Sequence, residues 1–328
     1  MATIADNRCS TQLVKSLRDA GMNSVRINSA HVEAKDIANM VNIIREAAHS
    51  LEILVDTKGP EIRTTPLADG LTHIHLNKGD KMAVKASADV LTTAEVVSIM
   101  APNLEKYLKK GDTIMIDDGV IELIVESNND GEVTAVVERG GELGSRKTVA
   151  LPGVDIPPMP AVSARDKAAI QAAAACGVEM IAHSFVRSAA DVAEVRALSG
   201  NMKVYSKIEC QEALDNLEEI IEASDGILVA RGDLGAEIAP ETLPIVQHRI
   251  VSLCHSAGKP VIVATQILDS MMTRSYPSRG EYSDIALAVM EGVSTLLLTG
   301  ETAKGQYPVE CVEVLRRTID ATVKYFSE

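Results

Sequence analysis

A lysine and two carboxylates in this chain are spaced so that together they could act on a phosphoryl group. Lys207 and Glu209 lie two residues apart in the apolar segment 203–209, and Asp233 follows the next apolar segment. Side chains two apart on a strand leave it on the same side. The carboxylates could hold a hard divalent cation, and the lysine could contact a phosphoryl group that this cation bridges. Taken alone, Lys207 and Glu209 are more simply explained as a surface salt bridge, so the rest of the chain has to decide.

The elements that would position these residues are eight short apolar segments, each followed by a helical pattern. The segments are residues 2–4, 24–28, 52–57, 179–185, 203–209, 226–232, 260–265 and 295–300. Apolar runs of this length suit strands that are covered on both faces, as in parallel sheets. The helical patterns are residues 10–20, 32–50, 163–176, 189–198, 211–223, 242–257, 283–291 and 308–327. Eight strand–helix units in alternation predict an α/β fold, the (β/α)8 TIM barrel.

The alternation is interrupted once, between residues 57 and 163. Here a two-residue period predicts antiparallel strands at residues 71–76, 81–86, 113–116, 120–127 and 132–138, with a hairpin turn at 128–131. We therefore expect a small inserted β-barrel lid domain after strand 3, over residues 63–160, between barrel parts 1–62 and 161–328. Pro152, Pro157, Pro158 and Pro160 predict a stiff connection at its end.

Composition and charge exclude several classes of partner. The net charge is −14, Trp is absent, and only two Phe and six Tyr are present. An acidic chain with so few aromatic side chains is poorly suited to bind nucleic acid or an acidic membrane. No apolar run approaches the ~18 residues of a membrane helix. The five cysteines include no Cys-x-x-Cys pair and the first residues lack a signal-peptide core, so we expect a cytoplasmic protein without disulfides or zinc.

Polar side chains stand at the predicted C-terminal ends of seven segments, where barrels of this class carry their chemistry. The end sequences are Arg26-Ile27-Asn28, Asp56-Thr57-Lys58, Ser184-Phe185-Val186-Arg187, Lys207-Ile208-Glu209, Arg231-Gly232-Asp233, Thr265-Gln266 and Thr299-Gly300-Glu301. Any single one is explained by the start of a loop, but the whole set is harder to explain by solvation. It contains carboxylates suited to magnesium, cations suited to phosphate, and the Thr265 hydroxyl, which could pass a proton. Neither a P-loop nor a dinucleotide-binding glycine motif accounts for it.

Six segments of the chain together resemble the signatures of the pyruvate kinase family, in that family's order. They are Gly21-Met22-Asn23-Ser24-Val25-Arg26-Ile27-Asn28, Asp56-Thr57-Lys58-Gly59-Pro60-Glu61-Ile62-Arg63, Ser206-Lys207-Ile208-Glu209, Ala230-Arg231-Gly232-Asp233-Leu234-Gly235, Ala264-Thr265-Gln266 and Gly300-Glu301-Thr302-Ala303-Lys304-Gly305. The resemblance extends from residue 2 to about residue 325. Each motif is modest alone, whereas six in order are highly specific.

The resemblance implies how the phosphoryl group and its metal are held. Arg26 and Lys207 correspond to residues that bind the phosphate of phosphoenolpyruvate, and Lys207 also stabilises charge on the transferring phosphoryl and on the enolate oxygen. Glu209 and Asp233 correspond to ligands of Mg²⁺, or of Mn²⁺ in its place.

The resemblance also implies a seat for the substrate carboxylate and a route for the proton. The backbone amides of Gly232 and Asp233, with Thr265, would hold the carboxylate. Thr265 would lie on the route by which enolpyruvate is protonated at carbon to give pyruvate.

Four further residues correspond to nucleotide contacts of the family. They are Asn28, His31, Arg63 and Lys147, and Lys147 comes from the inserted domain, which would close over ADP or ATP. Two of these have simpler explanations that stay open: His31 could cap a helix start, and Lys147 could be a solvated loop charge.

A potassium site is implied in weakened form. Asn28, Asp56 and Thr57 match the family's K⁺ ligands, but Ala30 stands where the family usually has Ser. One hydroxyl ligand is therefore missing, and our hypothesis is that Ser29 or water replaces it.

Two other departures bear on assembly and regulation. Residues 5–9 replace a Gly-Pro-containing loop, which puts one wall of the nucleotide site in doubt. The chain ends at Glu328, so we expect a short form that lacks the family's C-terminal allosteric domain. Residues 277–281 and the helix from Ser283 resemble the barrel-to-barrel interface, which predicts a homodimer.

The leading hypothesis is a glycolytic pyruvate kinase, a phosphotransferase that forms pyruvate and ATP from phosphoenolpyruvate and ADP. One alternative is a catalytically weak, truncated relative that serves as a ligand-binding or regulatory subunit. Another is a barrel lyase that acts on an oxo acid through magnesium. Lys207 and Lys147 favour phosphoryl transfer over the lyase.

Overall fold

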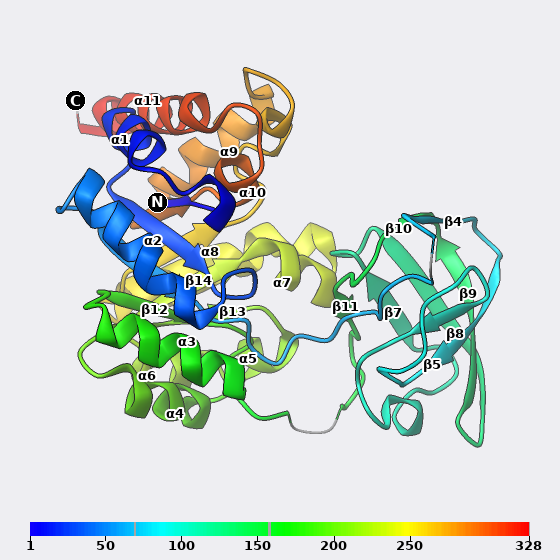
Figure 1. Ribbon diagram of the computed structural model, residues 1–328. Coiled ribbons are helices and arrows are strands. Elements are labelled where there is room, and N and C mark those ends of the chain that lie inside the picture. Colours follow the sequence, from blue (N-terminus) through cyan, green and yellow to red (C-terminus); the bar gives the residue numbers. More distant parts are fainter. Residues whose placement is uncertain (69, 157–158, 328) are drawn as a thin grey trace. The chain divides into compact units, whose positions relative to one another are not determined.

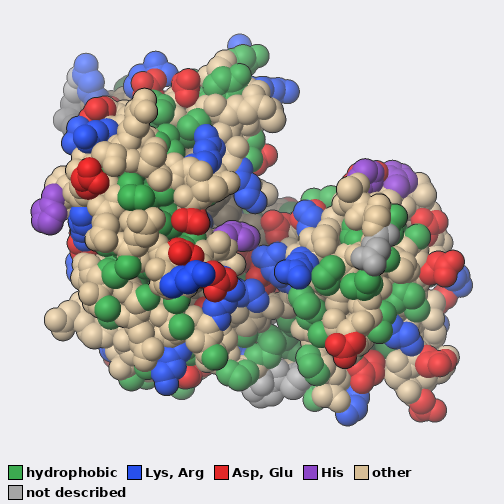
Figure 2. All heavy atoms as spheres, in the orientation of Figure 1, with side chains coloured by type: hydrophobic (Ala, Val, Ile, Leu, Met, Phe, Trp, Pro, Cys, Tyr) green, Lys and Arg blue, Asp and Glu red, His purple; other side chains and the backbone are tan. Residues whose placement is uncertain are grey.

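The computed structural model describes residues 1–68, 70–156 and 159–327, which fall into two compact units (Figure 1). Unit 1 comprises Met1–Pro60, Pro160–Arg231 and the described chain from Pro244 onwards, and unit 2 comprises Glu61–Met159 and Gly232–Leu243. Pro157 and Pro158 of the predicted stiff connection, and the residue Glu328, lie outside the described residues. Acidic and basic side chains are interspersed over the visible face of the molecule (Figure 2).

Unit 1 is built on a single sheet of eight strands, in the order β1-β2-β3-β12-β13-β14-β15-β16, with all neighbours parallel. An isolated parallel bridge between Ala2 and Leu298 joins the two edges and closes the sheet. The predicted (β/α)8 barrel is therefore confirmed. The strands are β1 (Ala2–Thr3), β2 (Ser24–Asn28), β3 (Glu52–Asp56), β12 (Met180–His183), β13 (Lys203–Ile208), β14 (Gly226–Ala230), β15 (Val261–Ala264) and β16 (Thr295–Leu297).

Alternate side chains of these strands form a cluster inside the barrel. Met180 and Ala182 of β12 belong to it, so Ile181 and His183 on the other side of this strand face the surrounding helices. Every residue of β12 and of β14 is buried. Burial on both faces explains why these strands read as continuous apolar runs rather than as alternating patterns. The cluster consists of Met1, Leu54, Met180, Ala182, Tyr205, Leu228, Ala230, Ile262, Ala264 and Leu297.

Helices surround the strands of unit 1 (Figure 1). Four of them begin at serines whose hydroxyls accept a backbone N–H: Ser10, Ser163, Ser188 and Ser278. The helices are α1 (Thr11–Asp19), α2 (Ala34–Ala47), α3 (Ala164–Ala175), α4 (Ala189–Ser199), α5 (Gln211–Asp215), α6 (Leu217–Ala223), α8 (Leu243–Ser256), α9 (Arg279–Met290), α10 (Gly300–Ala303) and α11 (Pro308–Ser327), with short 3-10 turns η1 (Asp6–Arg8) and η4 (Asp269–Met272).

Two predicted helices depart most from the observed ones. The helix expected over residues 283–291 begins earlier, at Arg279, because Ser278 and Glu281 form a reciprocal capping box. The helix expected over 211–223 is two helices, α5 and α6, which meet at Asn216. No helix of the described chain is long and apolar enough to cross a membrane, and none of the five cysteines forms a disulfide.

Unit 2 contains a six-stranded sheet, in the order β11-β7-β8-β9-β5-β6, and a two-stranded sheet of β10 and β4. At the β8–β9 turn Asp130 and Gly131 both have positive φ (52° and 91°), as a type I′ hairpin requires. The strands are β4 (Ile74–Leu76), β5 (Lys81–Lys85), β6 (Val96–Ser98), β7 (Thr113–Ile116), β8 (Ile121–Asn129), β9 (Glu132–Arg139), β10 (Gly141–Leu143) and β11 (Val149–Ala150), with a 3-10 turn η2 (Leu104–Lys106).

A short helix that the sequence did not predict follows β14 directly. This helix, α7 (Arg231–Glu237), takes the place of the expected end of the strand over 226–232. From Gly232 onwards it is grouped with unit 2, as is the 3-10 turn η3 (Pro240–Thr242). A Cβ added at Gly119 of unit 2 would lie 3.9 Å from the Cα of Ala236, so the two backbones approach closely.

Candidate active site

Residues at the C-terminal ends of β1, β2, β15 and β16 line a cavity of about 790 Å³ in unit 1. Four residues predicted to contact substrate or nucleotide line it: Arg26, Asn28, His31 and Thr265. They come from β2, the loop after it and the end of β15. The structure therefore brings together predicted site residues that are up to 239 positions apart in the chain (265 − 26). The segment 5–8 of the altered first loop forms part of the same wall.

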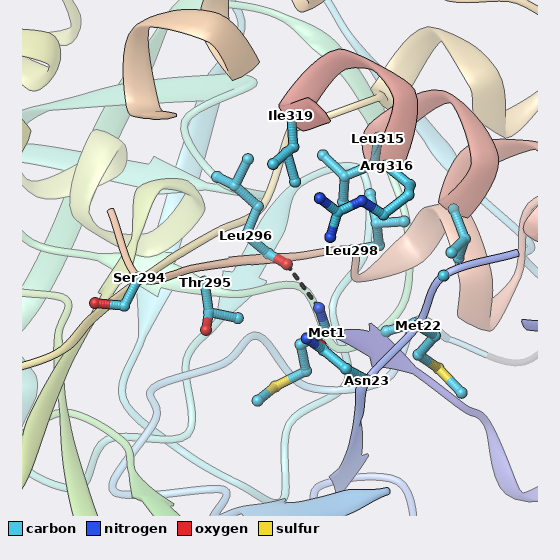
Figure 3. A pocket seen from close by; sticks show the side chains of 13 residues that line it. Met1, Met22, Asn23, Ser294, Thr295, Leu296, Leu298, Leu315, Arg316 and Ile319 are labelled. Atoms are coloured by element: carbon cyan, nitrogen blue, oxygen red, sulfur yellow. Dashed lines mark hydrogen bonds between the residues drawn. The ribbon is translucent and has the colours of Figure 1, made fainter. Parts of the chain in front are cut away.

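A second cavity of unit 1, of about 140 Å³, is lined largely by apolar side chains (Figure 3). It lies between β1, β16 and α11, where the nitrogen of Met1 donates to the carbonyl oxygen of Leu296 at 2.9 Å. Leu315 and Ile319 of α11 also line it. It contains none of the predicted site residues, so the larger cavity is the candidate site.

Asp56 joins two cations of the candidate site. Nε and Nη2 of Arg26 lie 2.7 and 2.6 Å from its Oδ2, and Nζ of Lys207 lies 3.3 Å from its Oδ1. Asp56 is only 1% exposed. Burial alone would raise the pKa of this carboxyl, but Lys207 and Arg26 lower it below its ordinary value. Asp56 is therefore ionised and holds both cations at the mouth of the barrel.

Lys207 and Glu209 form an ion pair of 2.8 Å, and the pair is buried rather than exposed to solvent. Oε2 of Glu209 accepts the backbone N–H of Phe185 at 2.7 Å. Oε1 faces Lys207 but accepts no hydrogen bond of good geometry from any described residue. A fully buried carboxylate oxygen with unused lone pairs is suited to a hard cation. The simpler explanation, a surface salt bridge, is wrong for this pair.

Ser184 and Phe185 are part of this arrangement; the sequence placed them at a strand end but assigned neither a role. Nζ of Lys207 donates to Oγ of Ser184 at 2.8 Å, and that hydroxyl donates to the carbonyl of Thr57 at 2.7 Å. Phe185 has φ of 53°, which is uncommon for a bulky residue. The only feature of the sequence that pointed to these two residues was their position directly after β12, since functional residues of such barrels lie at the C-terminal ends of strands.

Thr265 lies on a strained turn directly after β15. Thr265 and Gln266 have φ values of 68° and 54°, and for a β-branched residue this is a rare conformation. Arg231 donates to the carbonyl oxygens of both residues and also pairs with Asp284 of α9 at 2.8 Å. Backbone strain of this kind concentrates at functional sites, where surrounding contacts maintain it.

The predicted potassium ligands lie side by side at the ends of β2 and β3. Oδ1 of Asn28 accepts the backbone N–H of Ala30 at 3.0 Å, and Oγ1 of Thr57 accepts the N–H of Ser184 at 3.0 Å. The Ser29 hydroxyl donates to the carbonyl of Asp56 at 2.8 Å. This bond leaves the lone pairs of the Ser29 oxygen available.

The remaining predicted site residues belong to unit 2. Arg63 pairs with Glu61 through two bonds of 2.7 and 2.6 Å. Lys147 pairs with Asp117 at 2.8 Å, and its side chain is 35% exposed.

Gly232 and Asp233 lie in the first turn of α7, directly after β14, and are also grouped with unit 2. Among the described residues no three His, Cys, Asp or Glu side chains form a metal cluster. Mg²⁺ commonly takes only one or two carboxylates and completes its shell with water and substrate phosphate. Each of the two predicted ligands, Glu209 and Asp233, is a carboxylate of this kind. His31 is not the N-cap of α2, because that position is held by Glu33.

Comparison with known proteins gives a consistent result. A family model described as the barrel domain of pyruvate kinase matches residues 1–312. A pyruvate kinase of Geobacillus stearothermophilus is 40% identical over 328 residues, and one of Staphylococcus saprophyticus is 42% identical over 327. These alignments cover 97% and 96% of this chain but only 55% of each relative. A pyruvate kinase of Borreliella burgdorferi is 38% identical over 320 residues, with 96% and 66% covered. The chain thus spans about half to two thirds of the length of these relatives.

Proposed function

Because this chain belongs to the pyruvate kinase family, we propose that it transfers the phosphoryl group of phosphoenolpyruvate to ADP and so forms pyruvate and ATP in glycolysis. The observation that carries the proposal is the buried group of charges at the barrel mouth. Lys207 lies between the carboxylates of Asp56 and Glu209, and Asp56 also holds Arg26. Two fixed cations in a site sheltered from water are what a phosphoryl group with developing charge requires.

In this proposal the phosphate of phosphoenolpyruvate binds Arg26 and Lys207. Asp56 orients both cations before the substrate arrives, so little reorganisation is needed as charge develops. Lys207 neutralises charge that passes to the enolate oxygen when the bond to phosphorus breaks. The substrate carboxylate binds the backbone amides of Gly232 and Asp233 and the hydroxyl of Thr265. Thr265 then belongs to the route that delivers a proton to the methylene carbon of enolpyruvate.

Two cations complete the proposed site. Glu209 and Asp233 would hold Mg²⁺ or Mn²⁺, and the buried Oε1 of Glu209 supports this assignment. Such an ion supplies a Lewis acid that neutralises charge on phosphoryl oxygens. Asn28, Asp56 and Thr57 would hold K⁺, in a site weakened by the methyl group of Ala30.

We assign the nucleotide to Asn28 and His31 of the barrel and to Arg63 and Lys147 of the inserted domain, residues 63–160, acting as a lid. His31 and Asn28 line the large cavity, which supports this assignment. In unit 2 the guanidinium of Arg63 and the ammonium of Lys147 are each paired with a carboxylate. A nucleotide phosphate would compete with those carboxylates for the two cations.

The experiment that tests the proposal is a coupled assay for pyruvate formed from phosphoenolpyruvate and ADP. Lys207→Met should lower kcat by about 10²–10³, the usual cost of removing one preorganised group that stabilises the transition state. Lys203→Met is the matched control, because Lys203 is an exposed lysine at the opposite end of the same strand. A fall of less than about threefold for Lys207→Met would remove Lys207 from this role. Binding of phosphoenolpyruvate without any turnover would instead favour a regulatory or ligand-binding subunit.

We also propose that the protein is a homodimer joined through its barrels. Helix α9 carries three large side chains that are exposed in the single chain, namely Tyr282, Leu287 and Met290. Side chains of this kind suit the core of an interface. Sedimentation equilibrium should give twice the mass of the chain, and a monomer at micromolar concentration would contradict the proposal.

A further inference from the structure

We propose that Ser184 is a positioning residue for Lys207, and that the turn after β12 sets the reach of the lysine toward the phosphoryl group. The inference rests on the proposed function. It concerns a residue that makes its contribution through Lys207, since its hydroxyl bonds the ammonium group.

Lys207 lies near partners of two kinds. Its Nζ is 2.8 Å from Oε1 of Glu209 and 3.3 Å from Oδ1 of Asp56, and both are anionic. It also donates to Oγ of Ser184 at 2.8 Å, and this partner is neutral. A carboxylate attracts the ammonium strongly, so two carboxylates alone would draw it toward them and away from a substrate. The neutral hydroxyl orients a proton of the ammonium without offsetting its charge.

Ser184 is itself held in one orientation. Its single hydroxyl proton points to the carbonyl oxygen of Thr57 at 2.7 Å, which is shorter than the 3.2 Å to Oδ1 of Asp56. Its backbone N–H donates to Oγ1 of Thr57 at 3.0 Å. With the proton committed to Thr57, the lone pairs of Oγ are available to accept from Lys207. Ser184 is 1% exposed, so water does not compete for these bonds.

The backbone on either side reinforces this arrangement. Phe185 has φ of 53°, and in this conformation its N–H donates to Oε2 of Glu209 at 2.7 Å. Two consecutive residues of one turn therefore fix both members of the ion pair, Lys207 on β13 and Glu209 directly after it. Gly59 packs so closely that a Cβ added there would lie 2.7 Å from the Cβ of Ser184. The turn is thus held from the side of β3 as well.

The test is a double-mutant cycle with Ser184→Ala and Lys207→Met in the coupled pyruvate assay. Removing a buried hydrogen bond to a charged group should lower kcat about 10- to 100-fold. The KM for phosphoenolpyruvate should change less than threefold, because the charge of Lys207 remains. In the Lys207→Met background, Ser184→Ala should have almost no further effect, because the residue acts through the lysine. If the fold-loss in kcat of the double variant equals the product of the losses of the two single variants, the two residues act independently and the inference is overturned.

Further variants separate positioning from folding. Ser188→Ala removes the serine that caps α4, four residues along, and should lower the melting temperature without a comparable loss of kcat. Ser184→Cys keeps the bulk of the side chain but offers a weak acceptor, so its kcat should also fall, and full activity would refute the role. If the parent protein forms no pyruvate from phosphoenolpyruvate and ADP, the proposed function fails. If the parent is active and the Ser184 variants are fully active as well, the positioning inference alone fails.

Discussion

The buried imidazole of His183 should make the stability of the protein depend on pH. His183 is 1% exposed, and neither of its ring nitrogens has a hydrogen-bond partner among the described residues. Its pKa is lowered from 6.5 to about 4, chiefly by burial; Asp191 and Asp166 raise the pKa, and Lys207 and Arg187 lower it. The folded protein therefore keeps His183 neutral under conditions in which the unfolded chain binds a proton.

The size of the effect follows from the two pKa values. Because the folded pKa is the lower one, the stability due to neutral His183 is fully present above pH 6.5 and is lost as the pH falls toward 4. Between pH 7 and pH 5 the free energy of unfolding should decrease by about 2 kcal/mol from this residue, at ~1.36 kcal/mol per pKa unit. His183→Leu removes the titrating group at similar volume. At pH 7 this variant should be no less stable than the parent, because it removes two unsatisfied polar atoms.

The assay is urea unfolding followed by far-UV circular dichroism, since the chain contains no Trp. The quantity to compare is the change in unfolding free energy between pH 7 and pH 5 in the parent and in His183→Leu. The variant should lose about 2 kcal/mol less than the parent. His49→Leu, at an exposed position, controls for the loss of a histidine as such. If His183→Leu and the parent have the same pH dependence, then His183 is not a neutral buried base and the reasoning is wrong.

Three shorter predictions concern the candidate site and the proposed nucleotide contacts. Asp56→Asn should lower the free energy of unfolding by about 3–5 kcal/mol, because it leaves two buried cations without their shared anion. A loss below about 1 kcal/mol in urea titrations would contradict this. Lys147→Met removes a partly exposed ion pair with Asp117, so the free energy of unfolding should change by less than about 1 kcal/mol. The KM for ADP should rise, and an unchanged KM would exclude Lys147 from the nucleotide site. Replacing K⁺ by tetramethylammonium in the assay should reduce the rate, and equal rates would refute the potassium site.

The sequence predicted the barrel well because burial on both faces leaves a direct pattern. The strand expected over residues 24–28 has the observed bounds of β2, and that over 52–57 ends one residue beyond β3. The helix α7 was missed because Gly232 and Gly235 are poor helix formers, and contacts in the folded chain override their preference. The start of α9 was missed because Gly280 in its first turn is a poor helix former, and the capping box of Ser278 and Glu281 overrides this preference.

The site was predictable in composition but not in arrangement. Arg26 and Lys207 were identified from their places at strand ends, and the structure links them through Asp56. The role of Ser184 could not be read from the sequence, because a hydroxyl partner and a positive φ at Phe185 both depend on tertiary contacts. The absence of hydrogen-bond partners for the ring nitrogens of His183 among the described residues could not be predicted either, because His183 lies in a segment that is otherwise a continuous apolar run.

The closure of the barrel has a consequence for how the chain folds. The two edges meet where the N–H of Thr3 donates to the carbonyl of Leu298, residues separated by nearly the whole chain. Joining them closes a loop of nearly the whole chain, and the entropy cost of closure rises with the number of residues enclosed. Contacts of such long range slow folding. The seam between β1 and β16 should accordingly form after neighbouring strands such as β2 and β3 have paired, so that closure is a late step in assembly of the barrel.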